Sequence, residues 1–153
     1  HDALPISVNF GGGDLLSAGQ KDVFVAKFTP SGQPLWSKRF GDGEDQEISG
    51  AAVDDAGNIV LTGTFEGSVD MGGGAIASQG ARDIFAAKLS GAGDPLWSRR
   101  AGDWNNQVGM TIAVDGQGDV VIAGIFASEI NLGGEDLMTG GIFDLYLAKL
   151  AGE

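Results

Sequence analysis

The 153-residue chain contains no cysteine and one histidine, His1, at its first position. The lack of cysteine excludes disulfide bonds, thiol catalysis and thiolate metal sites. One histidine without a second ligand nearby is not enough for a metal centre. The missing cysteines do not fix the compartment, since many exported proteins also lack this residue.

Basic residues are also scarce, with 9 lysines and arginines against 21 acidic residues and a formal net charge of -12. Such a charge repels phosphate backbones and anionic lipids, so we expect no nucleic-acid partner. The sequence has no run of about 18 apolar residues, and no basic segment followed by an apolar one. We therefore expect no membrane insertion, and no signal peptide is present in this sequence.

Helical periodicity is missing as well, because no segment places apolar residues at i, i+3 and i+4 over three turns. Instead, short segments rich in Val, Ile and Phe are bounded by Gly, Asp, Asn and Pro, which is typical of strands. Glycine is abundant, with 27 residues against four prolines, but no G-X-Y period indicates collagen. Since 42% of the residues are hydrophobic, the chain can form a core.

The dominant feature is an internal repeat with a period of 61 residues. DVFVAKF begins at Asp22, DIFAAKL at Asp83 and DLYLAKL at Asp144, and both intervals are 61 residues. Other landmarks keep the same spacing: PLWS from Pro34 and Pro95, AVD from Ala52 and Ala113, and SVNFGGG, SVDMGGG and EINLGGE from Ser7, Ser68 and Glu129. The chain therefore holds about 2.4 copies of one unit.

One unit contains four predicted strands, at residues 48–54, 58–65, 83–89 and 95–100. The first two strands and the last two are joined by segments with the turn chemistry of hairpins. The strand from Val23 to Phe28 is apolar on both faces, so both faces of each sheet must pack against other parts of the protein.

A four-stranded antiparallel sheet that repeats and packs between its neighbours is a β-propeller blade. We therefore predict an all-β fold of such blades, in an incomplete propeller segment of about 2.4 repeats. Small residues such as Gly50 and Gly63 would let neighbouring sheets approach closely, with 48–54 as the innermost strand.

The combination of D-x-F-x-A-K-L, P-L-W-S, A-V-D-x-x-G-N-x-x-x-T-G and V-D-x-G-G-G resembles the bacterial β-propeller repeat (SBBP) family over residues 7–153. The resemblance implies a propeller and export or attachment to the bacterial surface, and hence an extracellular or cell-surface location. It implies no particular reaction.

The repeat also predicts domain boundaries. Counting back 61 residues from Thr62 predicts a strand end at residues 1–6, but the sequence there is HDALPI, which resembles a translated sequencing adapter. We expect 1–6 to be a non-native leader, with a natural cap as the alternative. The remaining boundaries define one incomplete propeller domain: an outer part of a blade at 7–46, a complete blade at 47–107 and a partial blade at 108–153.

Residues that recur in each copy are predicted to build the blade. Trp36 and Trp97 would fill the space between blades, with stacking on a sugar or quinone as the alternative. The aspartates before the third strand would form turn hydrogen bonds, and the lysines near its end would lie at a solvated edge: Asp22, Asp83, Asp144, Lys27, Lys88 and Lys149. The turn from Asp54 to Asn58 is predicted to be an Asx-type hairpin turn rather than a calcium loop.

The link from strand four to the next strand one differs most between copies, reading GDGEDQE at 41–47 and GDWNNQV at 102–108. The shared glycine, aspartate and glutamine would shape the loop. In a blade this link shares one rim with the 17-residue connection from strand two to strand three, where propellers usually bind ligands.

Two candidate sites follow from the residues that differ. An aromatic ring beside amides would stack on and hydrogen-bond a sugar, and neighbouring carboxylates would hold a hard cation such as calcium. The candidate ligand-binding residues are Asp103, Trp104, Asn105 and Asn106, and the candidate calcium ligands are Asp42, Glu44 and Asp45. The alternative is a pair of variable solvated loops. Apart from calcium, no cofactor is expected.

No catalytic residue is predicted, because the chain has no native histidine, no cysteine and no G-x-S-x-G motif. The first hypothesis is a non-enzymatic binding or adhesion scaffold whose partners are the remaining blades of the propeller and a protein or glycan. The second is a carbohydrate-binding propeller. The third is a fragment of a propeller enzyme, a hydrolase, lyase or quinoprotein, with its active site in other blades.

Overall fold

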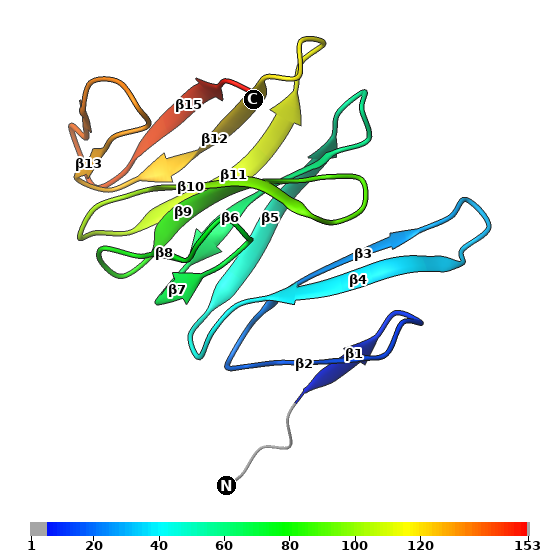
Figure 1. Ribbon diagram of the computed structural model, residues 1–153. Coiled ribbons are helices and arrows are strands. Elements are labelled where there is room, and N and C mark those ends of the chain that lie inside the picture. Colours follow the sequence, from blue (N-terminus) through cyan, green and yellow to red (C-terminus); the bar gives the residue numbers. More distant parts are fainter. Residues whose placement is uncertain (1–5, 153) are drawn as a thin grey trace, which may run out of the picture.

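The computed structural model describes residues 6–152, which form antiparallel strands and no helix (Figure 1). None of these residues belongs to a helix that could span a membrane. The strands are β1 (Ser7–Asn9), β2 (Asp14–Leu16), β3 (Val23–Phe28), β4 (Pro34–Phe40), β5 (Gln46–Val53), β6 (Ile59–Phe65), β7 (Ser68–Val69), β8 (Ile76–Ala77), β9 (Asp83–Leu89), β10 (Pro95–Ala101), β11 (Gln107–Val114), β12 (Val120–Phe126), β13 (Glu129–Ile130), β14 (Leu137–Met138) and β15 (Asp144–Leu150).

The central blade confirms the predicted four-stranded unit. Its strands hydrogen-bond in the order β10-β9-β6-β5, with every neighbouring pair antiparallel. The hairpin turn between β5 and β6 is closed by Asp54, whose Oδ1 accepts hydrogen bonds from the backbone N–H groups of Ala56 at 3.0 Å and Asn58 at 2.8 Å. The predicted Asx-type turn is therefore confirmed, and Asp115 forms the same turn in the next copy.

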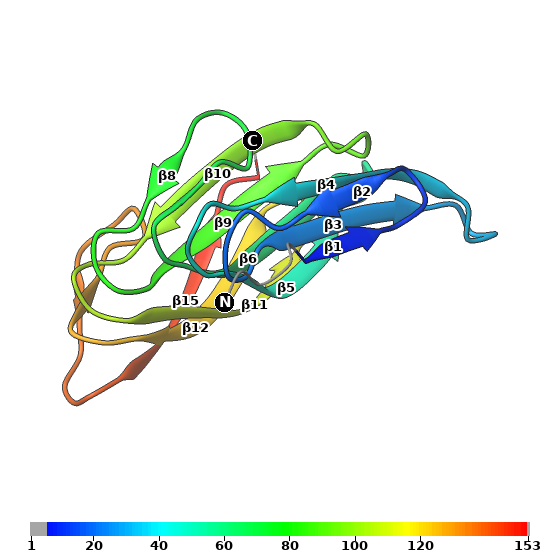
Figure 2. The ribbon, with the colours of Figure 1, turned by 90° about the horizontal axis from the view of Figure 1, so that it is seen from below.

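Two further sheets flank the central blade (Figures 1 and 2). β3 and β4 form a two-stranded sheet, which we call the first blade, and β11-β12-β15 form a three-stranded sheet, which we call the last blade. The three sheets repeat the same strand order as far as the described residues extend. The all-β, blade-like architecture is confirmed, although these sheets do not close into a ring.

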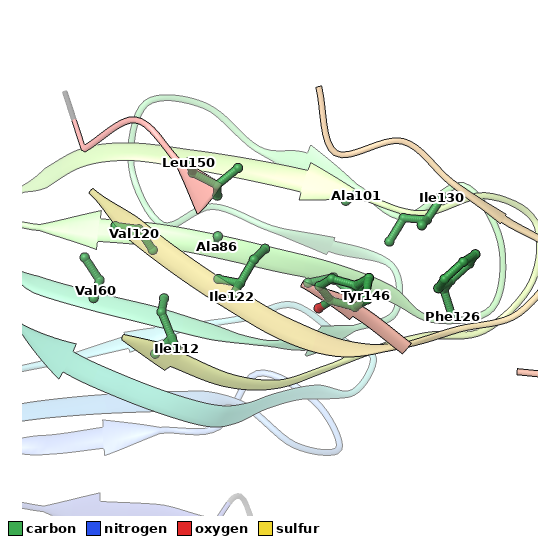
Figure 3. Close-up of a cluster of buried hydrophobic side chains, with 11 residues drawn as sticks. Val60, Ala86, Ala101, Ile112, Val120, Ile122, Phe126, Ile130, Tyr146 and Leu150 are labelled. Atoms are coloured by element: carbon green, nitrogen blue, oxygen red, sulfur yellow. The ribbon is translucent and has the colours of Figure 1, made fainter. Parts of the chain in front are cut away.

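Two hydrophobic clusters lie between the blades. Val23 and Val25 of the first blade pack against one face of the central blade, which contributes Phe65 and Phe85. The opposite face of the central blade packs against the last blade, and Figure 3 shows this second cluster around Ile122. Each blade therefore has two packed faces. We call the face that points toward the next blade in the sequence the forward face, and the face that points toward the preceding blade the backward face.

Close packing of the blades depends on Gly50 at the second interface. A Cβ atom at Gly50 would lie 3.0 Å from the backbone nitrogen of Ile112 on β11, closer than side chains normally approach. The predicted role of small residues in blade packing is confirmed at this position.

The 17-residue connection from strand two to strand three contains strands that were not predicted from the sequence. It contains a small hairpin, β7–β8 in the central blade, with β1–β2 and β13–β14 at the equivalent positions of the other two. Val69 and Met71 from this segment are almost completely buried in the first cluster. These apolar side chains explain why the segment folds back onto the blade.

The prediction of a solvated edge is wrong for two of the third-strand lysines. Lys27 Nζ donates a hydrogen bond to Gly91 O of the following blade at 2.7 Å, and Lys88 Nζ donates equivalently to Gly152 O at 2.8 Å. Lys88 is 5% exposed and also pairs with Asp54 at 3.1 Å. Inside the interface, backbone carbonyls of the next blade, and for Lys88 also a carboxylate, take the place of water as hydrogen-bond acceptors for these lysines.

The predicted leader lies largely outside the described residues, which begin at Ile6. The Ile6 carbonyl accepts a hydrogen bond from Ser17 N–H at 2.8 Å, as the Gly67 carbonyl does from Ser78 N–H. Repeat geometry is thus present from Ile6 onward, and the non-native origin of residues 1–6 stays a prediction.

Candidate functional site

The candidate site lies at the rim formed by the strand-four to strand-one loops. The loop at 41–45 joins β4 to β5, and the loop at 102–106 joins β10 to β11. Each contacts a strand-two to strand-three connection: Asp42 accepts hydrogen bonds from Ser68, and the Asn106 carbonyl accepts one from Ala127 N–H. Figures 1 and 2 show β8 at the same end of the stack as the loop after β10. The shared rim is therefore confirmed.

Asp42 organises the first loop through both carboxylate oxygens. Oδ1 accepts hydrogen bonds from Glu44 N–H at 2.9 Å and Gln46 Nε2 at 2.7 Å, and Oδ2 accepts from Ser68 N–H at 2.7 Å and Ser68 Oγ at 3.0 Å. Burial by itself would raise the pKa of Asp42, but these hydrogen bonds outweigh it and hold the pKa below its ordinary value. Asp42 thus joins the loop to β7 as a carboxylate.

Gln46 and Gln107 fix the ends of the two loops from inside the blade, and both are almost completely buried. Gln46 Oε1 accepts from Asp42 N–H at 3.0 Å, while its Nε2 also donates to Glu66 O at 3.1 Å. Gln107 repeats these contacts with Asp103 and with the carbonyl of Ala127. The residues shared between the loops therefore shape them, as predicted.

Beside the first loop, at 41–45, the rim carries a cluster of acidic and basic side chains, which we call the junction cluster. Its members are Lys21, Asp45, Glu47, Glu66 and Arg82. Arg82 Nε lies 2.7 Å from Glu66 Oε1, and its Nη2 lies 3.6 Å from Asp45 Oδ2. Lys21 pairs with Glu47. The hydrogen bond that Arg82 donates to Glu66 is the main reason that the pKa of Arg82 is raised. The cluster was not predictable from the sequence, because its members lie on three separate segments of the chain.

Beside the second loop, at 102–106, most of the repeat positions that correspond to the junction cluster carry neutral residues. Asp45, Glu47 and Glu66 are replaced by Asn106, Val108 and Ala127, and Phe143 stands at the position of Arg82. Trp104, where the first loop has Gly43, is 79% exposed.

The candidate ligand-binding residues lie together on the second loop. Asp103 Oδ1 accepts a hydrogen bond from Asn105 N–H at 2.8 Å, and Asp103 Oδ2 lies 3.5 Å from Asn105 Nδ2. Trp104, Asn105 and Asn106 are exposed. The segment between β8 and β9 lies close to this loop, since a Cβ atom at Gly80 would lie 2.4 Å from the backbone of Trp104. The backbone of the loop thus packs against the segment that contains Gly80, while its aromatic ring and amides are exposed to solvent.

The predicted calcium ligands do not converge on one point. Asp42 faces Ser68 and Gln46, Asp45 faces Arg82, and Glu44 is exposed. Among residues 6–152, no group of three or more histidine or acidic side chains is arranged to hold a metal ion. Calcium binding by these residues stays a prediction.

Trp36 and Trp97 lie between blades. Trp36 Nε1 donates to Gly91 O of the central blade at 3.2 Å, and its ring would lie 3.0 Å from a Cβ atom at Gly93. Trp97 packs against the second cluster, but its buried Nε1 has no hydrogen-bond partner among the described residues. These contacts support the structural interpretation of the repeated tryptophans.

No model of a known protein family matches the chain. The chain is 25% identical over 152 residues to an uncharacterized WD repeat-containing protein of Acanthamoeba polyphaga mimivirus. The match includes 90% of this chain but 11% of the viral protein, so the chain spans a small part of its relative. WD repeats form β-propellers. The similarity therefore indicates a repeat protein of the propeller-like kind and a scaffold-type fold.

Proposed function

We propose that this chain is a segment of a non-enzymatic β-propeller scaffold that binds a protein or glycan through the rim at 41–45 and 102–106. The observation that supports this proposal is that one framework carries two chemically different surfaces. Asp42 with Gln46, and Asp103 with Gln107, hold the two loops alike. The residues between them are charged in one loop and aromatic or amide in the other.

We further propose that the scaffold belongs to the bacterial β-propeller repeat family, in an exported or cell-surface protein with an adhesive role. The repeated motifs support this assignment, whereas the relative is viral and adds nothing to a bacterial or extracellular origin. Sequencing of the flanking genomic DNA tests it. We expect further 61-residue units and an export signal in the same reading frame, and a reading frame with neither would contradict it.

Carbohydrate binding is the second candidate function, because Trp104 is 79% exposed and lies beside two exposed amides. Exposed aromatic rings stack on apolar sugar faces, while neighbouring amides hydrogen-bond the hydroxyl groups. A glycan array probed with the wild-type chain should give signals that Trp104→Ala abolishes. Leu96→Ala is the matched control, because Leu96 is also exposed but lies at the opposite end of β10 from this loop. Binding that survives Trp104→Ala would exclude this candidate.

A further inference from the structure

Three large apolar side chains are exposed at the second loop. Trp104 on the loop is 79% exposed, and Ile142 and Phe143, in the segment before β15, are 81% and 49% exposed. One copy earlier, Arg82 at the position of Phe143 reaches Asp45 of the first loop at 3.6 Å. Phe143 therefore stands beside the second loop, and Figures 1 and 2 show both segments at the same end of the stack. We call Trp104, Ile142 and Phe143 the rim patch.

The exposure of the rim patch follows from its positions in the repeat. Trp104 lies between two blades that are both described, and its ring is exposed all the same. Ala81, at the position of Ile142 in the central blade, is also exposed, although the second loop lies beside it. The side chain of Arg82, at the position of Phe143, is 38% exposed next to the same loop. A following blade therefore leaves these positions open to solvent.

The rim patch continues into an acidic surface around the first loop. Arg82 forms a parallel bridge with Asn106, so the segment before β9 connects the second loop to the junction cluster. On and beside the first loop, carboxylates outnumber cationic groups: Asp42, Glu44, Asp45, Glu47 and Glu66 against Lys21 and Arg82. The rim thus presents apolar side chains on one loop and an excess of negative charge on the other.

We propose that the rim binds an extended, basic segment of a partner protein, with a large apolar side chain on the rim patch and Lys or Arg side chains over the first loop. The excess of carboxylates attracts a cationic partner and repels an anionic one. The exposed indole ring of Trp104 also favours a neighbouring cation. An extended chain of 12 residues is about 40 Å long, enough to lie across both loops.

The composition of the rim favours a protein segment over a glycan. The side chains of Ile142 and Phe143 have no hydrogen-bonding groups for the hydroxyl groups of a sugar. A neutral glycan also gains nothing from the carboxylates beside the first loop. This inference rests on the proposed function, since it names the chemistry of the partner at the same rim.

Selection of peptides tests the proposal without a known partner. A phage library of random dodecapeptides is panned against the full chain, and the affinities of the selected peptides are measured by fluorescence anisotropy. We expect peptides with a net positive charge and a large apolar residue. Selected peptides that are neutral or acidic would overturn the proposal.

A variant without most of the rim patch shows where these peptides bind. Trp104→Gly combined with Ile142→Ala introduces the residues of the preceding copy, Gly43 and Ala81, which the same framework already accommodates. We expect the double variant to bind the selected peptides at least about tenfold more weakly, since apolar anchors dominate such interfaces. Leu96→Ala is the control. Equal affinity of the wild type and the double variant would contradict the proposal.

The role of charge is tested by a matched pair of variants. Glu44→Lys reverses a charge on the first loop, and Asp55→Lys makes the same change in an exposed turn at the opposite end of β5. We expect Glu44→Lys to weaken peptide binding at least about threefold more than Asp55→Lys, with the difference vanishing near 1 M salt, where the Debye length is about 3 Å. Equal effects at low salt would contradict charge complementarity at the rim.

This inference and the proposed function fail in different ways. If no selected peptide depends on the rim patch, while Trp104→Ala abolishes signals on the glycan array, the partner is a glycan. The basic-segment proposal is then wrong and the rim function stands. If neither peptides nor glycans depend on the rim, both proposals are wrong.

Discussion

β9 and β15 carry the same motif, DIFAAKL and DLYLAKL, but their environments differ. All seven residues of β9 are buried, whereas β15 alternates, with Tyr146 and Leu150 buried and Leu145 and Leu147 exposed. The buried side chains of β15 lie on its backward face, against the central blade. The forward face has no blade over it among the described residues.

Burial in this protein is therefore set by the position of a blade in the stack. Ile84 is 0% and Ala86 is 3% exposed, whereas Leu145 and Leu147 at the same repeat positions are 81% and 74% exposed. Val23 and Val25, one repeat earlier, are also buried. Apolar residues at the forward positions are a property of the repeat, and they are buried only where a following blade covers them.

The largest expected difference comes from truncating this equivalent pair. Ile84→Ala should lower the free energy of unfolding by about 2–5 kcal/mol, because it removes buried methyl groups and leaves a cavity between blades. Leu145→Ala should change it by less than about 0.5 kcal/mol, because the side chain is solvated. Urea unfolding followed by tryptophan fluorescence measures both. Equal losses would show that the forward face of the last blade is covered in solution.

The third-strand lysines provide the next comparison. Lys88→Met should cost about 3 kcal/mol, since it leaves the carboxylate of Asp54 buried without its cation. The value lies at the low end for a buried pair because Asp54 keeps its hydrogen bonds from Ala56 and Asn58. Lys149 is half exposed, so solvent screens its ion pair with Asp115, and Lys149→Met should lower the unfolding midpoint much less than Lys88→Met does. Equal unfolding midpoints for the two variants would contradict the interface role of Lys88.

Acid should weaken the same part of the central blade. The side-chain hydrogen bond from Asn58 is the main reason that the pKa of Asp54 falls to about 2 in the folded protein, and Lys88 lowers it further. A folded-state pKa below the unfolded value stabilises the fold above about pH 4, and this contribution disappears as the pH falls through about 2. Asp54→Asn should therefore be less stable than the wild type at pH 6, with the difference shrinking between pH 4 and pH 2. A pH-independent difference would contradict this assignment.

The smallest stability effect is expected at the rim. Trp104→Gly gives the second loop the residue that the first loop has at Gly43, and it should change the unfolding free energy by less than about 0.5 kcal/mol, because the ring is 79% exposed. Thermal unfolding by circular dichroism checks this value. A large loss would show that Trp104 packs against the framework, which would weaken the carbohydrate-binding candidate.

The strands of the central blade were predictable because each has a local signature. Alternating or continuous apolar residues between turn residues located β5, β6, β9 and β10 within two residues, and the fixed period gave their equivalents in the other blades. The hairpin β7–β8 was missed, although SVDMGGG repeats and places Val69 and Met71 on one side. Two apolar residues before three glycines are too short a signal for a strand pair, and packing against the blade supplies the rest of the stabilisation.

The candidate site was predictable in outline. The shared aspartates and glutamines indicated fixed loops, and the residues between them indicated variable chemistry. The pairing of Arg82 with Asp45 and Glu66 was not predictable, because these residues come together only when the connection packs against the loop.

The sequence by itself determined the repeat, the antiparallel strands and the loop-shaping residues, since each depends on neighbours within one unit. The tertiary structure decided which equivalent residues are buried and which lysines bridge blades. The physical reason is that these properties belong to contacts between units, and identical positions in a repeat differ only in what lies next to them.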